Sequence, residues 1–266
     1  MANYGQERKI VYWLLDDVAK RKHDIKWCEF ENSLGQLRCD KIIKKWGDDR
    51  FDRQCLKDSV DDIRGFFFEW INTIGLSETR RIEPYMSLID GKRDIALSFN
   101  YTETLECVYE METSNICYIH GQRETDPVLQ KEKAMRPFGK GNSSLVVGFG
   151  PMHVKNSREA DKKSMLMGLY KHTKSIIYQH RTFFDKIAHS GIKEIYSLGF
   201  SFAEVDLPYI KKICDVLRYD NHDRDITWFI SPYGKVMQRV RDEIYFRKCI
   251  RRAGFRGRIR KLKSDT

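Results

Sequence analysis

The sequence has no long apolar run, and this absence excludes one class of protein at the outset. No stretch of the 266 residues approaches the roughly eighteen consecutive apolar residues of a membrane-spanning helix. The opening residues MANYGQERKI also lack the apolar segment of a secretory signal. We therefore expect a soluble, cytoplasmic protein that does not contact the membrane. With 41% apolar and 12% aromatic residues, the chain can still build a substantial core.

Paired cysteines and metal-binding histidine motifs are missing as well. The seven cysteines are odd in number and scattered, and none forms a C-x-x-C pair. This pattern fits neither a disulfide framework nor a zinc knuckle, and no H-E-x-x-H motif is present. We expect reduced, mostly buried thiols and no metal.

Common nucleotide and hydrolase motifs are absent too. The sequence contains neither a G-x-S-x-G elbow nor a G-x-G-x-x-G fingerprint. FGKGNSSL, residues 138–145, only superficially resembles a phosphate loop, because its spacing differs and it precedes a predicted strand. These absences argue against an α/β-hydrolase and against an ordinary dinucleotide dehydrogenase.

Positive charge is concentrated at one place in the chain. The formal charge is +10, and residues 247–263 hold nine Lys or Arg and no acid, so the remainder carries about 10 − 9 = +1. We predict a basic C-terminal tail over residues 247–266. Such a tail is usually a solvated end, and the alternative is a weak contact with nucleic acid.

Apolar spacing predicts a mostly helical N-terminal region over residues 1–92. Its clearest helix covers residues 52–75 and ends at Gly75. The apolar stripe of this helix has members three or four residues apart, namely Leu56, Val60, Ile63, Phe67, Trp70 and Ile74.

After Gly91 the pattern changes to short apolar runs that alternate with helical segments. Strands are predicted at residues 94–99, 117–120, 144–149, 194–200 and 225–230, and helices at 102–111, 174–191, 205–219 and 233–249. This alternation is typical of parallel sheets with helices on both faces. We predict an α/β core over residues 93–246.

Small or polar residues stand where several of these strands end. Asn100 and His120 end two strands, and the other strand ends carry Gly148, Gly150, Gly199 and Ser201. Ligands of parallel sheets bind at the carboxyl ends of the strands. Local structure offers an alternative, since Asn100 and Glu103 have capping-box spacing and Asp206 with Pro208 is typical of a helix start. His120 is harder to explain locally, because an imidazole beside a glycine can transfer a proton near neutral pH.

Four segments in this order closely resemble the bacteriophage abortive infection AbiH family: SFNYTETLE, YIHG, LVVGFG and SLGFSFAEVDLPYI. The resemblance covers about residues 93–219, with a weaker likeness over residues 27–37. The family is in turn similar to sirtuin-like NAD-processing proteins, in which a strand-end Asn-Tyr and a later His-Gly lie at the nicotinamide ribose. The resemblance implies a sirtuin-like, Rossmann-type fold and a role in antiviral defence, with a phage component as trigger.

The resemblance also implies roles for individual residues. Asn100 would orient a ribose hydroxyl or the attacking water, and His120 would act as general base or polarise the ribose. Thr102 stands where sirtuin-like relatives usually carry an acid. NAD or a related nucleotide is the implied substrate or ligand. With the strand ends above, the predicted nucleotide-binding set is Ser98, Tyr101, Thr102, Gly121, Gly148, Gly199, Ser201 and Asp206.

One part of the family pattern is missing. AbiH relatives open with an apolar strand and a Gly-Asn-Gly-Phe-Asp turn, whereas this chain opens MANYGQERKIVYWLL. Without the glycines of that turn we expect weaker pyrophosphate binding. Two alternatives to an NAD glycohydrolase-like enzyme stay open. One is a non-catalytic defence module that senses a nucleotide or contacts nucleic acid, and the other is an inactive, N-truncated family member.

Overall fold

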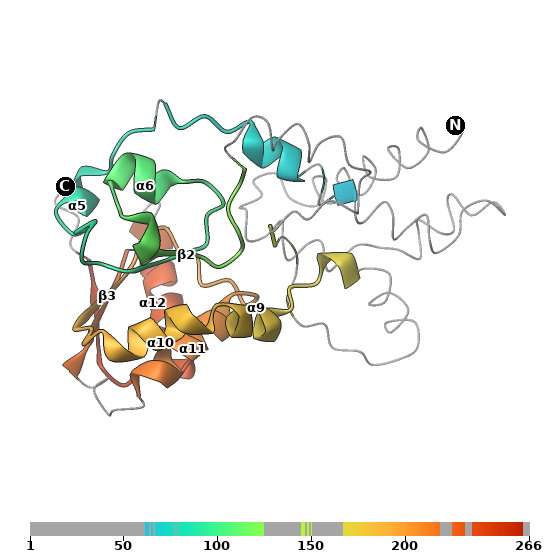
Figure 1. Cartoon of the computed structure of the whole chain (residues 1–266). Coiled ribbons are helices and arrows are strands. Elements are labelled where there is room, and N and C mark those ends of the chain that lie inside the picture. Colours follow the sequence, from blue (N-terminus) through green and yellow to red (C-terminus); the bar gives the residue numbers. More distant parts are fainter. Residues whose placement is uncertain are drawn as a thin grey trace, which may run out of the picture. The chain divides into compact units, whose positions relative to one another are not determined.

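The computed structural model describes residues 62–124, 145–150, 167–218, 225–231 and 236–262, except residues 64, 66, 78, 147 and 149. The chain forms two compact units, and it passes between them several times (Figure 1). Among the described residues, the first unit holds 62–75, 100–103, 120–124, 145–150 and 167–171, and the second holds the others. Predictions for residues 1–61 and most of 125–166 lie outside the described residues.

The first unit contains the end of the predicted N-terminal helix. Residues 62–72 are helical wherever they are described, and Ile63, Phe67 and Ile71 bury one face because they recur every four residues. Trp70 was predicted on this face but is 51% exposed. It lies at the border of the stripe, where its ring contacts Phe67 with centroids 5.8 Å apart. The only other short helix given for this unit's described residues is the 3-10 turn η2, Met167–Leu169.

The second unit contains a two-stranded parallel sheet. Strand β1, Ala96–Ser98, pairs with β2, Ile116–Tyr118. Helix α6, Thr104–Tyr109, and the 3-10 turn η1, Thr113–Asn115, lie between them in the chain. These elements confirm the strand, helix and strand predicted over 94–120, with shorter ends. Helix α5, Glu83–Met86, precedes β1.

The same unit also contains a three-stranded sheet (Figure 1). Its strands are β3, Glu194–Ser197, β4, Thr227–Ile230, and β5, Arg258–Lys261, all parallel in the order β3-β4-β5. Helix α11, Leu207–Leu217, connects β3 to β4, and α12, Val236–Arg252, connects β4 to β5. Parallel neighbours need such crossovers, and the predicted α/β class is confirmed. The apolar face predicted for α11 is buried as expected, with Ile210, Ile213, Cys214 and Leu217 inward.

The helix predicted over residues 174–191 is divided in two. Helix α9, Thr173–Gln179, ends at His180, and α10, Arg181–His189, begins directly after it. The backbone of His180 has φ −97° and ψ 21°, outside the helical range. Its imidazole Nδ1 lies 3.3 Å from Cys117 Sγ, so a contact with β2 accompanies the break.

Two segments differ from their predictions. In the predicted strand 144–149, the described residues Leu145, Val146 and Gly148 are not in a strand. Residues 247–262, which the charge pattern places in a solvated basic tail, instead include the end of α12 and strand β5. Long-range packing explains this order: Ile250 and Phe255 are buried, and the Phe255 ring meets the Trp228 ring edge-on at 5.2 Å.

In the part of the chain that the structure describes, no helix combines the length and apolar character needed to cross a membrane.

Candidate functional site

The ten predicted site residues are distributed over both units. The first unit holds both predicted catalytic residues, Asn100 and His120, together with Tyr101, Thr102, Gly121 and Gly148. The second unit holds Ser98, Gly199, Ser201 and Asp206.

Three segments of the first unit are joined around the ring of Tyr101. The Tyr101 hydroxyl donates to the Val146 carbonyl at 2.8 Å, and the Val146 amide donates to the His120 carbonyl at 2.7 Å. The rings of Tyr101 and His120 are stacked, with centroids 6.2 Å apart and planes 30° apart. Tyr101, which follows Asn100, therefore contacts His120 directly, although the two lie about twenty positions apart in the chain.

Tyr101 is a packing residue as much as a site residue. It is 5% exposed, and its ring meets Phe67 edge-on with centroids 4.9 Å apart. The helix over residues 62–72 thus supports the ring that contacts His120. Edge-on aromatic pairs contribute about 0.5–1.5 kcal/mol beyond the area they bury.

Arg123 organises the same cluster, although no pattern in the sequence predicts this role. Its amide donates to the Tyr101 carbonyl at 2.8 Å. Its guanidinium donates to both Glu103 carboxylate oxygens, one of them at 2.7 Å, and to the Ile74 carbonyl. The Arg123 side chain is 10% exposed and the Glu103 side chain 15%. These hydrogen bonds hold the pKa of Glu103 below its usual value, so the pair is ionised at neutral pH.

The ion pair also tests the alternative interpretation of Asn100 as the first residue of a capping box with Glu103. A capping box on Asn100 would start the helix at residue 101 and direct Glu103 back to the amide of Asn100. Helix α6 instead begins at Thr104, and Arg123 binds the Glu103 carboxylate. The capping-box interpretation is therefore wrong.

The two predicted catalytic side chains differ in their access to solvent. Asn100 lies two residues after the end of β1 and is exposed to solvent. His120 is only 2% exposed, and Gly121 after it has a φ of 84°. A glycine takes this left-handed conformation at little cost, and it turns the chain directly after the histidine.

Gly148 is explained by packing within the first unit. Its φ is 147°, and a Cβ built there would lie 1.8 Å from the Leu169 carbonyl oxygen. The close approach is to backbone, which cannot move aside as a side chain could. This glycine lets the segment around residue 148 pass against residues 167–169, and no ligand is needed to explain it.

In the second unit, the turn after β3 has an unusual backbone. Gly199 has φ 64°, and Phe202, a bulky residue that is fully buried, has φ 54°. Such a conformation is uncommon for an aromatic residue and is retained only where the surroundings impose it. The Phe202 ring packs against Phe200 and Phe246 at 4.7 and 4.8 Å, and its carbonyl accepts a 2.9 Å bond from the Tyr245 hydroxyl.

The other predicted residues of this unit occupy different environments. Ser201 is exposed, Ser98 is the last residue of β1 and 6% exposed, and Asp206 is 7% exposed. Asp206 occupies the N-cap position of α11, with Pro208 in the first turn, so the predicted helix start is confirmed. Its side chain makes no capping hydrogen bond.

A cysteine and a histidine also meet in this unit, at Cys117 Sγ and His180 Nδ1. Such a pair can form a thiolate nucleophile where charge is stabilised. Here burial raises the pKa of Cys117 to about 12 and lowers the pKa of His180. Both groups are therefore neutral at physiological pH, and the pair does not supply an activated nucleophile. Among the described residues, no group of three or more His, Cys, Asp or Glu is placed to hold a metal ion.

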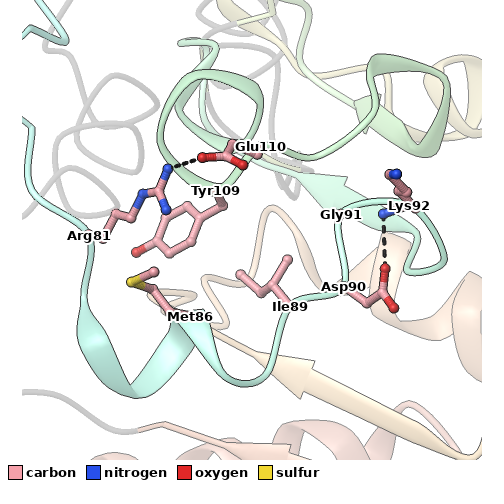
Figure 2. Close-up of a pocket in the computed structure, with 8 residues that line it drawn as sticks. All are labelled: Arg81, Met86, Ile89, Asp90, Gly91, Lys92, Tyr109 and Glu110. Atoms are coloured by element: carbon pink, nitrogen blue, oxygen red, sulfur yellow. Dashed lines mark hydrogen bonds and ion pairs between the residues drawn. The ribbon is translucent and has the colours of Figure 1, made fainter.

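A pocket of about 470 Å³ lies elsewhere in the second unit (Figure 2). Figure 2 shows Arg81 and Tyr109 at one end and Asp90 at the other. Its lining charges are mostly neutralised locally, since Arg81 pairs with Glu110 and Asp90 with Arg93. None of the ten predicted residues lines this pocket, and its paired charges offer little to an ionic ligand.

The family model described as "Bacteriophage abortive infection AbiH" matches residues 2–231 of this chain. Comparisons with curated proteins and with solved structures gave no match.

Proposed function

The chain belongs to the bacteriophage abortive infection AbiH family, and from this premise we propose that it binds NAD or a related nucleotide and hydrolyses its glycosidic bond. Membership of the family supports a role in defence against phage by abortive infection. The nucleotide chemistry is our addition, and it rests on the residues of the first unit.

The ring contact between Tyr101 and His120 carries this proposal. The contact holds the His120 imidazole beside Tyr101. The residue before Tyr101 is Asn100, which is exposed to solvent. An amide can orient the ribose or the attacking water, and an imidazole can accept the proton that this water loses. Gly121 and Thr102 adjoin them and are the proposed contacts to the ribose.

The proposed reaction is a displacement by water at the anomeric carbon. As the bond to nicotinamide breaks, its electron pair leaves with the ring nitrogen, and positive charge develops on the ribose. His120 accepts a proton as water forms the new carbon–oxygen bond, giving free nicotinamide and ADP-ribose. The Asn100 carboxamide oxygen stabilises the developing charge or orients the water. Positioned proton transfer of this kind contributes about 10²–10⁴-fold in rate.

Release of nicotinamide by the purified full chain tests the proposal. We expect Asn100→Ala to lower the rate at least about a hundredfold, and unfolding in urea checks that the variant remains folded. His120→Gln should lower it similarly, and glutamine is preferred to alanine because it leaves a smaller cavity at a buried position.

Two matched variants control for the loss of an amide or an imidazole in general. Gln179→Ala removes an exposed amide from the end of α9, and His189→Gln removes an exposed imidazole from α10. Both should retain the wild-type rate. Equal rates from wild type, Asn100→Ala and His120→Gln, or no release with and without phage extract, would refute the enzymatic proposal.

The burial of His120 favours a second candidate function. At 2% exposure its imidazole reaches a nucleotide only if the surrounding segments move. A module that binds the nucleotide without cleaving it needs no such movement. Calorimetric titration distinguishes the two, since a sensor would bind NAD through Asn100 and release no nicotinamide.

A further inference from the structure

One face of the β3-β4-β5 sheet carries aromatic and basic side chains in register. Side chains alternate between the faces of a strand, so paired residues on neighbouring strands share a face. The pairing aligns Tyr196 of β3 with Phe229 of β4 and then with Arg260 of β5. A second row two residues away contains Arg258 on the same face.

The aromatic residues on this face remain partly open to solvent. Tyr196 and Phe229 are only partly buried, whereas Trp228 and Ile230 on the opposite face are 1% and 0% exposed. The Tyr196 and Phe229 rings are stacked on each other, with centroids 4.9 Å apart and planes 9° apart. The opposite face of β4 thus belongs to the core, and on this face the two rings are partly open to solvent while Thr227 is 8% exposed.

The basic side chains of α12, β5 and the turn between them are exposed and uncommitted, and two of them, Arg258 and Arg260, lie on the same face as the rings. Six of them make no hydrogen bond or ion pair with any residue that the structure describes: Lys248, Arg252, Arg256, Arg258, Arg260 and Lys261. Their neighbours Arg247 and Arg251 differ, since Arg247 pairs with Glu243 and Arg251 donates to the Phe255 carbonyl. The six positive charges are therefore available to a ligand, and α12 and β5 fix the positions of most of them.

Two acids lie near the Tyr196 ring, Glu194 and Asp94, and neither is paired with Arg258 or Arg260 among the described residues. Glu194, at the start of β3, accepts a 2.6 Å hydrogen bond from the Tyr196 hydroxyl. Arg258 is two strands away, in the same row, with Thr227 between them. The Tyr196 ring stays neutral, because partial burial and the Glu194 carboxylate raise its pKa to about 12.

We propose that this face binds single-stranded nucleic acid, with bases stacking on the Tyr196 and Phe229 rings and phosphates bound by Arg258 and Arg260. Sheet-borne aromatic rings next to basic side chains suit unpaired bases, which expose a ring face that a duplex conceals. Arginine binds a phosphate through two parallel N–H donors. An anionic membrane would use the charge but would not stack flat groups on the ring faces.

Binding of fluorescent oligonucleotides of about 12 nucleotides, followed by anisotropy across a salt series, tests the proposal. Single-stranded DNA, single-stranded RNA and a duplex of the same length are compared with vesicles that contain phosphatidylserine. We expect both single strands to bind more tightly than the duplex. The DNA and RNA arms show which backbone is preferred.

Two variants separate the stacking contribution from the charge contribution. Arg258→Gln/Arg260→Gln should lower the slope of log K against log salt by about 1.4, since each phosphate contact contributes about 0.7 for a single strand. Phe229→Leu should weaken binding about tenfold and leave the slope unchanged, because it removes a ring and no charge. Circular dichroism checks the folding of Phe229→Leu, and the arginine pair, which is exposed, provides the test if that variant does not fold.

A double variant elsewhere in the unit is the matched control. Arg80→Gln/Lys174→Gln removes two exposed cations from other elements and should leave affinity unchanged. The proposal is overturned if this control loses as much affinity as the Arg258/Arg260 pair. It is equally overturned if folded wild type binds only the duplex, only vesicles, or nothing. Nicotinamide release by Asn100→Ala and His120→Gln tests the proposed function separately, because none of the variants used here changes either residue.

Discussion

Removing the Arg123 guanidinium should loosen the whole cluster around His120. In the Arg123→Met variant the side chain keeps its apolar stem but no longer bonds the Glu103 carboxylate or the Ile74 carbonyl. Glu103 then remains largely buried without a counter-charge. The segment that includes Arg123 loses its hydrogen bond to the Ile74 carbonyl, and the ring contact of Tyr101 with Phe67 remains.

The expected size of the effect follows from burial. The two side chains are 10% and 15% exposed, so the pair resembles a buried ion pair more than a surface one. Removing one partner of a buried pair costs about 3–5 kcal/mol. Because some solvent contact remains, we expect about 3 kcal/mol for Arg123→Met. Glu103→Gln should cost less, since an uncharged amide can still accept from the guanidinium.

A double-mutant cycle measures the interaction itself. Wild type, Arg123→Met, Glu103→Gln and the double variant are unfolded in urea, and hydrogen exchange is followed in peptides from residues 62–75 and 100–124. We expect the double variant to lose at least about 1 kcal/mol less than the sum of the single variants. Additive losses, with no change in exchange near residue 120, would refute the view that this pair holds the cluster.

The pair also predicts a dependence on pH. The pKa of Glu103 is lowered from its usual 4.5 in the folded state. Its contribution to stability is therefore complete above about pH 4.5 and is lost as pH falls through the folded pKa. Glu103→Gln should lack this component of the acid sensitivity, and an unchanged acid transition would count against the ion pair.

Two further changes test local features. Gly148→Ala should lower the free energy of unfolding by at least about 2 kcal/mol, because the new Cβ would clash with the Leu169 carbonyl and the φ is unfavourable for alanine. Gly191→Ala is the control: its φ is 62° but the space around it is open, so it should cost only about 1–2 kcal/mol. At pH 8 iodoacetamide should label Cys107, which is exposed. It should spare Cys117, because burial raises the pKa of that thiol to about 12. Equal labelling of the two cysteines would contradict the burial of Cys117.

Periodicity predicted the elements of the second unit well, because their apolar patterns are local. The face of α11 and the alternation from β3 to β4 could be read from residue spacing alone. The strand β5 could not, since RGRIRKL is dominated by charge and has no apolar alternation. Its strand conformation comes from pairing with β4, a contact between distant parts of the chain. The break at His180 depends similarly on Cys117 in another strand.

The candidate site was predicted less completely. Strand ends and the family resemblance indicated Asn100 and His120, and the structure connects their neighbourhoods through Tyr101. Neither spacing nor resemblance identified Arg123, because an arginine in a polar loop carries no signal until its acidic partner is known. Gly148 was predicted to bind a nucleotide, and the structure gives it a packing role against Leu169. Its part in nucleotide binding stays a prediction.

The sequence by itself determined the α/β class, the helices with clear apolar faces and the family, since each depends on residue types at short spacing. Only the tertiary structure decided which residues meet: Tyr101 with His120, Arg123 with Glu103, and Tyr196 with Phe229 beside Arg260. The physical reason is that ion pairs, ring stacking and strand register join positions far apart in the chain, and local preferences contain no information about those partners.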